Sequence, residues 1–294
     1  MREGDVVIED TAGAVFRGIG QETDLNDLAF TTGQVDGDGA AGPGGRCESR
    51  FDRIEDDRGP ARSGIQDLDK GEGFAGGIHK VVDETQLRQV LSETTEDMLM
   101  EEFIDAQIVT YDGLTDGNGQ ICFENSLIYG EGVLEYVLGK DTFFYVSRHI
   151  PSELSQIGKQ LAKRFKIRRK FFHFEFFNVD GDYMPIEINC RPPGGAILDM
   201  MNYSVDDDLY AAYARMIAYG EAAVASEKKY YCCYIGRRDK QYVHSHSDIL
   251  NRFGHSLVEY EENPLIFQKA MGKYRYILRS ASESEMHHMA DYVL

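Results

Sequence analysis

The stretch HFEFFNVDGDYMPIEINCR, residues 173–191, decides the fold of the second half of this 294-residue chain. Two runs rich in aromatic and aliphatic residues flank the turn sequence at residues 180–182, a pattern that is typical of a β-hairpin. A three-residue loop at 180–182 predicts that Val179 faces Tyr183 across the hairpin. This register fixes which side chains meet along the two strands.

The predicted hairpin brings acidic and polar side chains onto one face. Glu175 lies directly opposite Glu187, and His173 lies opposite Asn189. Because side chains alternate along a strand, Glu187, Asn189 and Arg191 are predicted to share a face. Directly opposed residues have Cβ atoms about 5 Å apart, so two carboxylates placed there repel unless a cation or a proton joins them.

Oxygen ligands of this kind favour a hard divalent cation. The carboxylates of Glu175 and Glu187 and the amide oxygen of Asn189 suit Mg²⁺ or Mn²⁺, and Mg²⁺ is usually held by one or two carboxylates together with substrate phosphates. Arg191 follows closely and carries a donor fork suited to a phosphate or a carboxylate. The alternative interpretation is an ordinary hairpin with outward-facing glutamates, against which the aromatic flanks argue.

Composition excludes several classes of function. Lys plus Arg is 31 and Asp plus Glu is 50, which gives a formal net charge of −19. Such a surface repels phosphate backbones, so we expect no nucleic-acid partner. No run approaches the roughly 20 apolar residues of a membrane span, so we expect no membrane partner. The N-terminus lacks an apolar signal core and the five cysteines form no CxxC pair, which indicates reduced thiols and a cytoplasmic protein.

The first 70 residues differ from the rest of the chain. They contain 12 of the 30 glycines and none of the 17 tyrosines. A segment of this composition cannot bury enough apolar surface to offset its ordering entropy. We therefore expect residues 1–70 to be either a disordered acidic leader or a segment read in a shifted frame.

From Gly76 onward the pattern predicts an α+β protein of antiparallel strands and packed helices. The predicted elements are a helix capped by Asp83, strands at 108–114, 120–129 and 143–147, a helix opened by Pro151, a helix from Ser204 to Tyr219 that stops at Gly220, and strands near 230–235 and 273–278.

Three motifs resemble the ATP-grasp enzymes, which are ATP-dependent carboxylate–amine or carboxylate–thiol ligases. FHFEFF at 172–177, followed by EINCRPPGG at 187–195, looks like their metal-binding core. MEEFI at 100–104, with YDG at 111–113, is similar to the hinge segment that meets adenine. Residues 199–220 resemble the helix after the core in carbamoyl-phosphate-synthase-like and biotin-carboxylase-like members. The resemblance covers about residues 71–220 and implies the ATP-grasp fold.

The resemblance implies a role for each matching residue. Glu175, Glu187 and Asn189 would hold the Mg²⁺ or Mn²⁺ that bridges the ATP phosphates, and Arg191 would be the catalytic residue that stabilises charge on the transferred phosphoryl group. The implied nucleotide-binding residues are Gly76 and Gly77 in a phosphate loop, Lys80 after it, Glu101, Glu102, Phe103 and Ile104 near the adenine or ribose, and Phe177 as the adenine floor.

A domain organisation and an activity follow from the same resemblance. The family's N-terminal domain is absent or scrambled in residues 1–70, residues 71–105 are a remnant of the lid, 106–222 are the core with the metal site, and 223–294 are a C-terminal lobe. The implied activity is a ligation in which ATP converts a carboxylate into an acyl phosphate and an amine displaces the phosphate. We expect small-molecule carboxylate and amine substrates, and the sequence leaves a homodimer open.

One departure from the family supports an alternative. The lid of the family has a strand ending in a lysine that holds phosphate oxygens, whereas IQDLDK at 65–70 has no apolar strand before Lys70. Asp69 falls near the expected lysine position, and an aspartate there would repel the phosphates. The alternative function is therefore a catalytically inactive nucleotide-binding fragment, and a structural or partner-binding fragment is a third reading.

Overall fold

The computed structural model describes residues 6–10, 16–17, 29–30, 79–81, 83–93, 98–102, 104–132, 136, 139–220, 222–225 and 227–294. The chain divides into two compact units, Met1–Asp105 and Ala106–Leu294. Within the described residues, no helix combines the length and apolar composition that crossing a bilayer requires.

The first unit contains an antiparallel sheet in which the strand nearest the N-terminus is central. Its strand order is β4-β1-β5. The elements of this unit are β1 (Val6–Asp10), β2 (Phe16–Arg17), which pairs with β3 (Ala29–Phe30), β4 (His79–Val81), α1 (Glu84–Glu93) and β5 (Met98–Glu102). Asp83 accepts a hydrogen bond from the backbone N–H of Gln86 at 2.8 Å, which confirms the predicted helix cap. The prediction for residues 1–70 falls mostly outside the described residues and stays a prediction.

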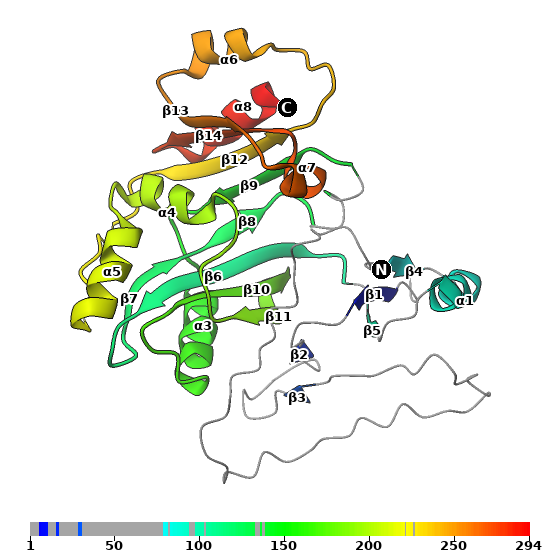
Figure 1. The fold of residues 1–294 in the computed structure, drawn as a ribbon, viewed down its shortest axis with the longest axis horizontal. Coiled ribbons are helices and arrows are strands. Elements are labelled where there is room, and N and C mark those ends of the chain that lie inside the picture. The colour runs from blue at the N-terminus through cyan, green and yellow to red at the C-terminus, as the bar shows by residue number, and fades with distance from the viewer. Residues whose placement is uncertain are drawn as a thin grey trace. The chain divides into compact units, whose positions relative to one another are not determined.

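The second unit is built on one nine-stranded sheet within the described residues. Its order is β11-β10-β6-β8-β9-β12-β14-β13, with β7 also paired to β6, and Figure 1 shows this order from β11 upward. The strands are β6 (Gln107–Thr115), β7 (Ile121–Asn125), β8 (Leu127–Tyr129), β9 (Thr142–Val146), β10 (Phe171–Val179), β11 (Asp182–Asn189), β12 (Tyr231–Arg237), β13 (Leu257–Glu262) and β14 (Tyr274–Ser280). Strands on both sides of residue 222 therefore share a single sheet.

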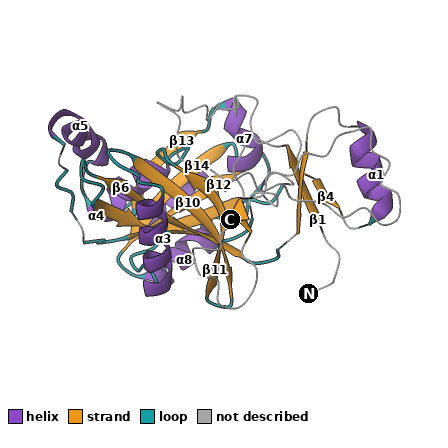
Figure 2. Cartoon of the chain, turned by 90° about the horizontal axis from the view of Figure 1, so that it is seen from below, coloured by secondary structure: helices purple, strands orange, loops and turns teal. Residues whose placement is uncertain are grey.

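Helices cover both faces of this sheet. They are α3 (Ser152–Arg164), α4 (Ile197–Val205), α5 (Leu209–Tyr219), α6 (His246–Phe253), α7 (Leu265–Met271) and α8 (Glu283–Val293). Strand alternation sends Phe144 into the cluster that contains residues of α4 and α5, and the next residue, Tyr145, into the cluster that contains residues of α6 and α8. α3 packs against β6 and β11 (Figure 2).

The helix predicted over residues 204–219 is two helices. Ser204 lies inside α4, where it is buried, so the prediction that it caps a helix is wrong. The first helix, α4, ends at Asp206, which has φ +53°. Asp208 then caps α5 by accepting a hydrogen bond from the N–H of Ala211. The predicted stop at Gly220 is confirmed, with φ +84° at that residue.

The hairpin of β10 and β11 turns in two residues. Val179 pairs with Asp182, so the predicted three-residue loop is wrong. Asp180 and Gly181 have φ values of +55° and +98°. Positive φ at both central residues is the geometry of a type I′ turn, which the Asp-Gly sequence favours.

Candidate functional site

A β-bulge restores the register that brings the two glutamates together. Phe176 pairs with Pro185, whereas the preceding residue, Glu175, pairs with Glu187. Ile186 is therefore the extra residue of β11, as in a β-bulge. The bulge compensates for the shorter turn, so the predicted opposition of Glu175 and Glu187 is confirmed.

Four polar side chains form a row across four strands of the same face. His173 pairs with Asn189 on β11, as predicted, and with Asp112 on its other neighbour, β6. Asp112 in turn pairs with Asn125 of β7. His173 and Asp112 are 4% and 1% exposed and Asn125 is buried, whereas Asn189 at the end of the row is partly exposed.

Hydrogen bonds connect this row to the carboxylate pair. His173 Nδ1 lies 2.5 Å from Asp112 Oδ1, and its Nε2 lies 2.9 Å from Glu175 Oε1. Asp112 Oδ2 accepts hydrogen bonds from the hydroxyl of Thr110 at 2.6 Å and from Asn125 Nδ2 at 3.3 Å. The imidazole thus links a fully buried carboxylate to one that is part of the candidate site.

The charge of His173 follows from its two carboxylate neighbours. Burial by itself lowers the pKa of the imidazole, but the charge of Asp112 and the hydrogen bonds to Asp112 and Glu175 outweigh burial and raise the pKa to about 10. At neutral pH both ring nitrogens therefore carry protons and donate. The buried, protonated imidazole of His173 therefore orients the carboxylate of Glu175 through a hydrogen bond.

The residues present fit a hard divalent cation. Within the described residues, no group of three His, Cys, Asp or Glu side chains gathers as a metal site, so the candidate set depends on Glu175, Glu187 and the amide of Asn189. Asn189 Nδ2 is buried and has no hydrogen-bond partner among the described residues. Since amide oxygen and nitrogen exchange when the side chain flips, Asn189 offers a cation an acceptor or a phosphate a donor. Mg²⁺ bound with substrate phosphates needs no larger protein ligand set.

Arg191 lies just beyond the end of β11. Because the strand ends at Asn189, alternation no longer fixes the side to which Arg191 points. Arg191 Nη1 donates to the carbonyl of Pro192 at 3.0 Å, and the residue is partly exposed. A guanidinium carries five N–H donors, so this bond leaves further donors for a ligand.

The predicted nucleotide-binding residues belong to both units. Phe177, the predicted adenine floor, is half-buried and follows Glu175 by two residues on the same face. Ile104 is half-buried, Lys80 lies in β4, Glu101 and Glu102 lie in β5, and Gly76, Gly77 and Phe103 lie outside the described residues. The roles assigned to all of these residues, to Arg191 and to the metal set stay predictions.

Sequence reasoning did not single out Asn125 or Thr110, and it included Asp112 only as part of the YDG motif. A signal for Asp112 was present, because an ionisable residue in the middle of an apolar predicted strand is rarely buried without a partner. The identity of that partner, His173, depends on β6 pairing with β10 over a separation of 61 residues. No local pattern specifies such a pairing.

Part of the chain matches a known protein family. Residues 59–199 match the family model described as the ATP-grasp domain, so the match begins 12 residues before the predicted start of the resemblance at residue 71. Comparison with curated protein sequences gave no match.

Several solved structures are similar to this chain. One is an L-amino acid ligase from Bacillus licheniformis, with a TM-score of 0.57 and 10% identity, covering 73% of this chain and 59% of that chain. A second is N5-carboxyaminoimidazole synthetase from Staphylococcus aureus, with a TM-score of 0.51, 15% identity and coverage of 74% and 59%. A third is phosphoribosylglycinamide synthetase from Anaerococcus prevotii, with a TM-score of 0.50, 12% identity and coverage of 74% and 61%.

The chain thus spans about three fifths of the length of these solved structures. At such low identities the similarity establishes the fold alone. The family match at residues 59–199, the antiparallel sheet and the polar face of β10 and β11 all indicate the same fold. This chain has the ATP-grasp fold, and its residues 59–199 match the model of the ATP-grasp domain.

Proposed function

We propose that this chain is an ATP-dependent ligase that joins a carboxylate to an amine. The substrate carboxylate attacks the γ-phosphate of ATP to give an acyl phosphate and ADP, and the amine then displaces phosphate from the acyl carbon. The observation that carries the proposal is the direct opposition of Glu175 and Glu187 on a face shared with Asn189. Carboxylates gathered in this way favour a cation, and a metal-bound nucleotide supplies one.

The protein's own contribution is positioning and charge. His173 holds one oxygen of Glu175 at 2.9 Å, and Asp112 fixes the imidazole from the other side, so Glu175 is oriented before any ligand arrives. Arg191 is the residue we assign to the charge that develops on the transferred phosphoryl group. Mg²⁺, when bound by Glu175, Glu187 and Asn189, supplies neutralisation of the phosphate charge.

The names of similar structures support the reaction class. They are called an L-amino acid ligase, an N5-carboxyaminoimidazole synthetase and a phosphoribosylglycinamide synthetase. These names differ in substrate, so they favour ligation in general and no particular carboxylate or amine.

A second candidate function is a nucleotide-binding fragment without turnover. The observation that favours it is the sequence IQDLDK at 65–70, which places Asp69 near the position where the lid of the family carries a phosphate-binding lysine. Such a fragment would bind Mg·ADP through the same carboxylates and would release no ADP from ATP.

One experiment separates the two functions. ADP formation from Mg·ATP is measured with a panel of small carboxylates and amines, on the full chain and on Glu187→Gln. The matched control is Glu227→Gln, an exposed glutamate outside the site. Carboxylate-dependent ADP formation that disappears in Glu187→Gln and survives in Glu227→Gln supports the ligase. Mg·ADP binding without carboxylate-dependent turnover supports the fragment, and the absence of both contradicts the metal assignment.

A further inference from the structure

A cavity of about 200 Å³ opens between α4, α7 and the sheet. Its lining includes Gly195 and Asp199 from the β11–α4 segment, Tyr234 from β12, Met271 from α7 and Arg275 from β14. Cavities that hold drug-sized ligands measure about 300–1,000 Å³, so this one suits a smaller molecule.

The cavity lies on the same face of the sheet as the carboxylate pair. Tyr234 pairs with Phe144, and Phe144 pairs with Tyr129. These three rings belong to one buried cluster, against which Ile108 packs. Ile108 pairs with Phe177, which shares its face with Glu175, so a continuous row of side chains joins the cavity to the candidate site.

The loop after β11 provides a second connection. Arg191 lies near its start, and Gly195 lines the cavity near its end. Gly195 has φ +60°, and a Cβ built there would lie 3.8 Å from Met271 Cε, so the loop reaches the α7 wall. A molecule in the cavity therefore sits beside the segment that carries the residue assigned to the phosphoryl group.

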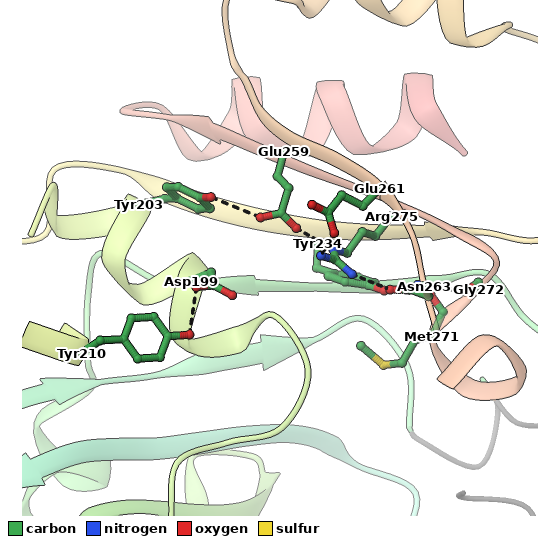
Figure 3. A network of polar contacts seen from close by, with 10 residues as sticks. All are labelled: Asp199, Tyr203, Tyr210, Tyr234, Glu259, Glu261, Asn263, Met271, Gly272 and Arg275. Atoms are coloured by element: carbon green, nitrogen blue, oxygen red, sulfur yellow. Dashed lines mark hydrogen bonds and ion pairs between the residues drawn. The ribbon is translucent and has the colours of Figure 1, made fainter. Parts of the chain in front are cut away.

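The charges around the cavity favour a cation. Arg275 Nε lies 2.5 Å from Glu259 Oε1, and the same guanidinium pairs with Glu261 and donates to Asn263 (Figure 3). The single positive charge of Arg275 is therefore paired with two carboxylates, those of Glu259 and Glu261. Asp199 adds a third carboxylate beside the cavity. This excess of negative charge disfavours a carboxylate ligand.

Asp199 is the polar group best placed to receive that cation. Its Oδ1 accepts a hydrogen bond from the hydroxyl of Tyr210 at 2.9 Å (Figure 3). Among the described residues, no hydrogen bond engages Oδ2. One oxygen is thus held in place, while the other is available to an N–H donor in the cavity.

The rest of the lining is rigid and mainly apolar. Asn263 Nδ2 donates to the hydroxyl oxygen of Tyr234 at 2.7 Å and to the carbonyl of Gly272 at 2.8 Å, which fixes the wall formed by these residues. Phe267 and Met271 add apolar surface. A lining of this kind accepts a short hydrocarbon chain next to one charged group.

We propose that this cavity binds the amine substrate of the ligase, with its ammonium group at Asp199 and its carbon chain against Tyr234, Phe267 and Met271. The proposal rests on the proposed function, because it assigns one of the two substrates of that reaction. It names the substrate as a small primary amine, with the carboxylate substrate held elsewhere.

Binding is measured by calorimetry on the full chain without ATP, so that the result does not depend on turnover. The probes are n-butylamine, as its hydrochloride, and n-butanol at matched ionic strength. We expect saturable binding of n-butylamine and not of n-butanol. Asp199→Asn should weaken amine binding by about tenfold or more, because it removes a charge-assisted hydrogen bond. Asp291→Asn, at an exposed position of α8, is the matched control and should leave amine binding unchanged.

A second variant tests the apolar wall. Phe267→Ala enlarges the cavity, so the preference should shift from n-butylamine toward n-hexylamine. Equal binding of amine and alcohol, or undiminished amine binding in Asp199→Asn, would overturn the proposal. Amine binding that depends on Asp199, together with a lack of carboxylate-dependent ADP formation, would support the cavity as an amine site and contradict the ligase function.

Discussion

Asp112 and His173 form a buried charge pair between β6 and β10, with Oδ1 and Nδ1 2.5 Å apart. The pair lies directly behind Glu175, whose carboxylate is 2.9 Å from the second ring nitrogen of His173. Because both members of the pair are almost fully buried, removing either side chain would leave the other buried without its partner. The candidate site is therefore built on a part of the core.

We predict that Asp112→Ala lowers the free energy of unfolding by about 3–5 kcal/mol, because it leaves the imidazole of His173 buried without its main partner. Urea unfolding of the full chain measures the change. Asp291→Ala, on the exposed surface of α8, should change stability by less than about 0.5 kcal/mol. A loss below about 1 kcal/mol for Asp112→Ala would mean that the buried pair contributes little.

Glu187→Gln should separate stability from ligand binding. It removes one of two like charges that face each other, so the free energy of unfolding without nucleotide should stay the same or rise slightly. The affinity for Mg·ADP should fall by about tenfold or more, since one of two carboxylate ligands is lost. Thermal unfolding and calorimetry measure the two quantities, with Glu227→Gln as control. A variant that lost both equally would indicate a structural role for Glu187.

Glu124 should make stability depend on acid pH. Burial by itself raises its pKa, but hydrogen bonds from Tyr111 at 2.7 Å and Lys159 at 3.0 Å lower the pKa below its usual value of 4.5. A carboxyl group with a lowered pKa in the folded state stabilises the protein above its unfolded pKa, and this stabilisation is lost as pH falls through the folded value. Unfolding free energy should therefore decrease below about pH 4.5. The same measurement on Glu124→Gln should give a flatter curve, and parallel curves would contradict the assignment.

Gly158→Ala tests the contact between α3 and β6. A Cβ at Gly158 would lie 2.0 Å from Tyr111 Cδ1, which is too close for any real contact. Alanine favours a helix over glycine by about 1 kcal/mol, but overpacking costs about 1–3 kcal/mol, so we expect a net loss of stability. Lys163→Ala, on the exposed side of α3, should have almost no effect. Stabilisation by Gly158→Ala would show that the ring of Tyr111 moves without penalty.

Local patterns predicted much of the second unit because they act within one segment. The Pro151 start of α3 and the alternation in β10 and β11 depend on residues that are neighbours in sequence. The errors arose where two local solutions compete. A two-residue turn with a bulge at Ile186 and a three-residue loop without one give the same opposition of Glu175 and Glu187. Ser204 failed as a cap because it lies inside α4, and Asp208, four residues later, caps α5 instead.

The sequence by itself determined that Glu187 and Asn189 share one face, because the period of a strand is a property of the segment. Glu175 lies on that face in the structure because the bulge at Ile186 offsets the two-residue turn. Only the tertiary structure decided which residues from other strands and helices lie near these side chains. Asp112 contacts His173 only because β6 and β10 pair, and Asp199 and Arg275 line one cavity only because α4 packs on the part of the sheet that contains β14. Burial of apolar surface over the whole sheet favours one order of strands and helices, and such a global condition has no signature in any single stretch of residues.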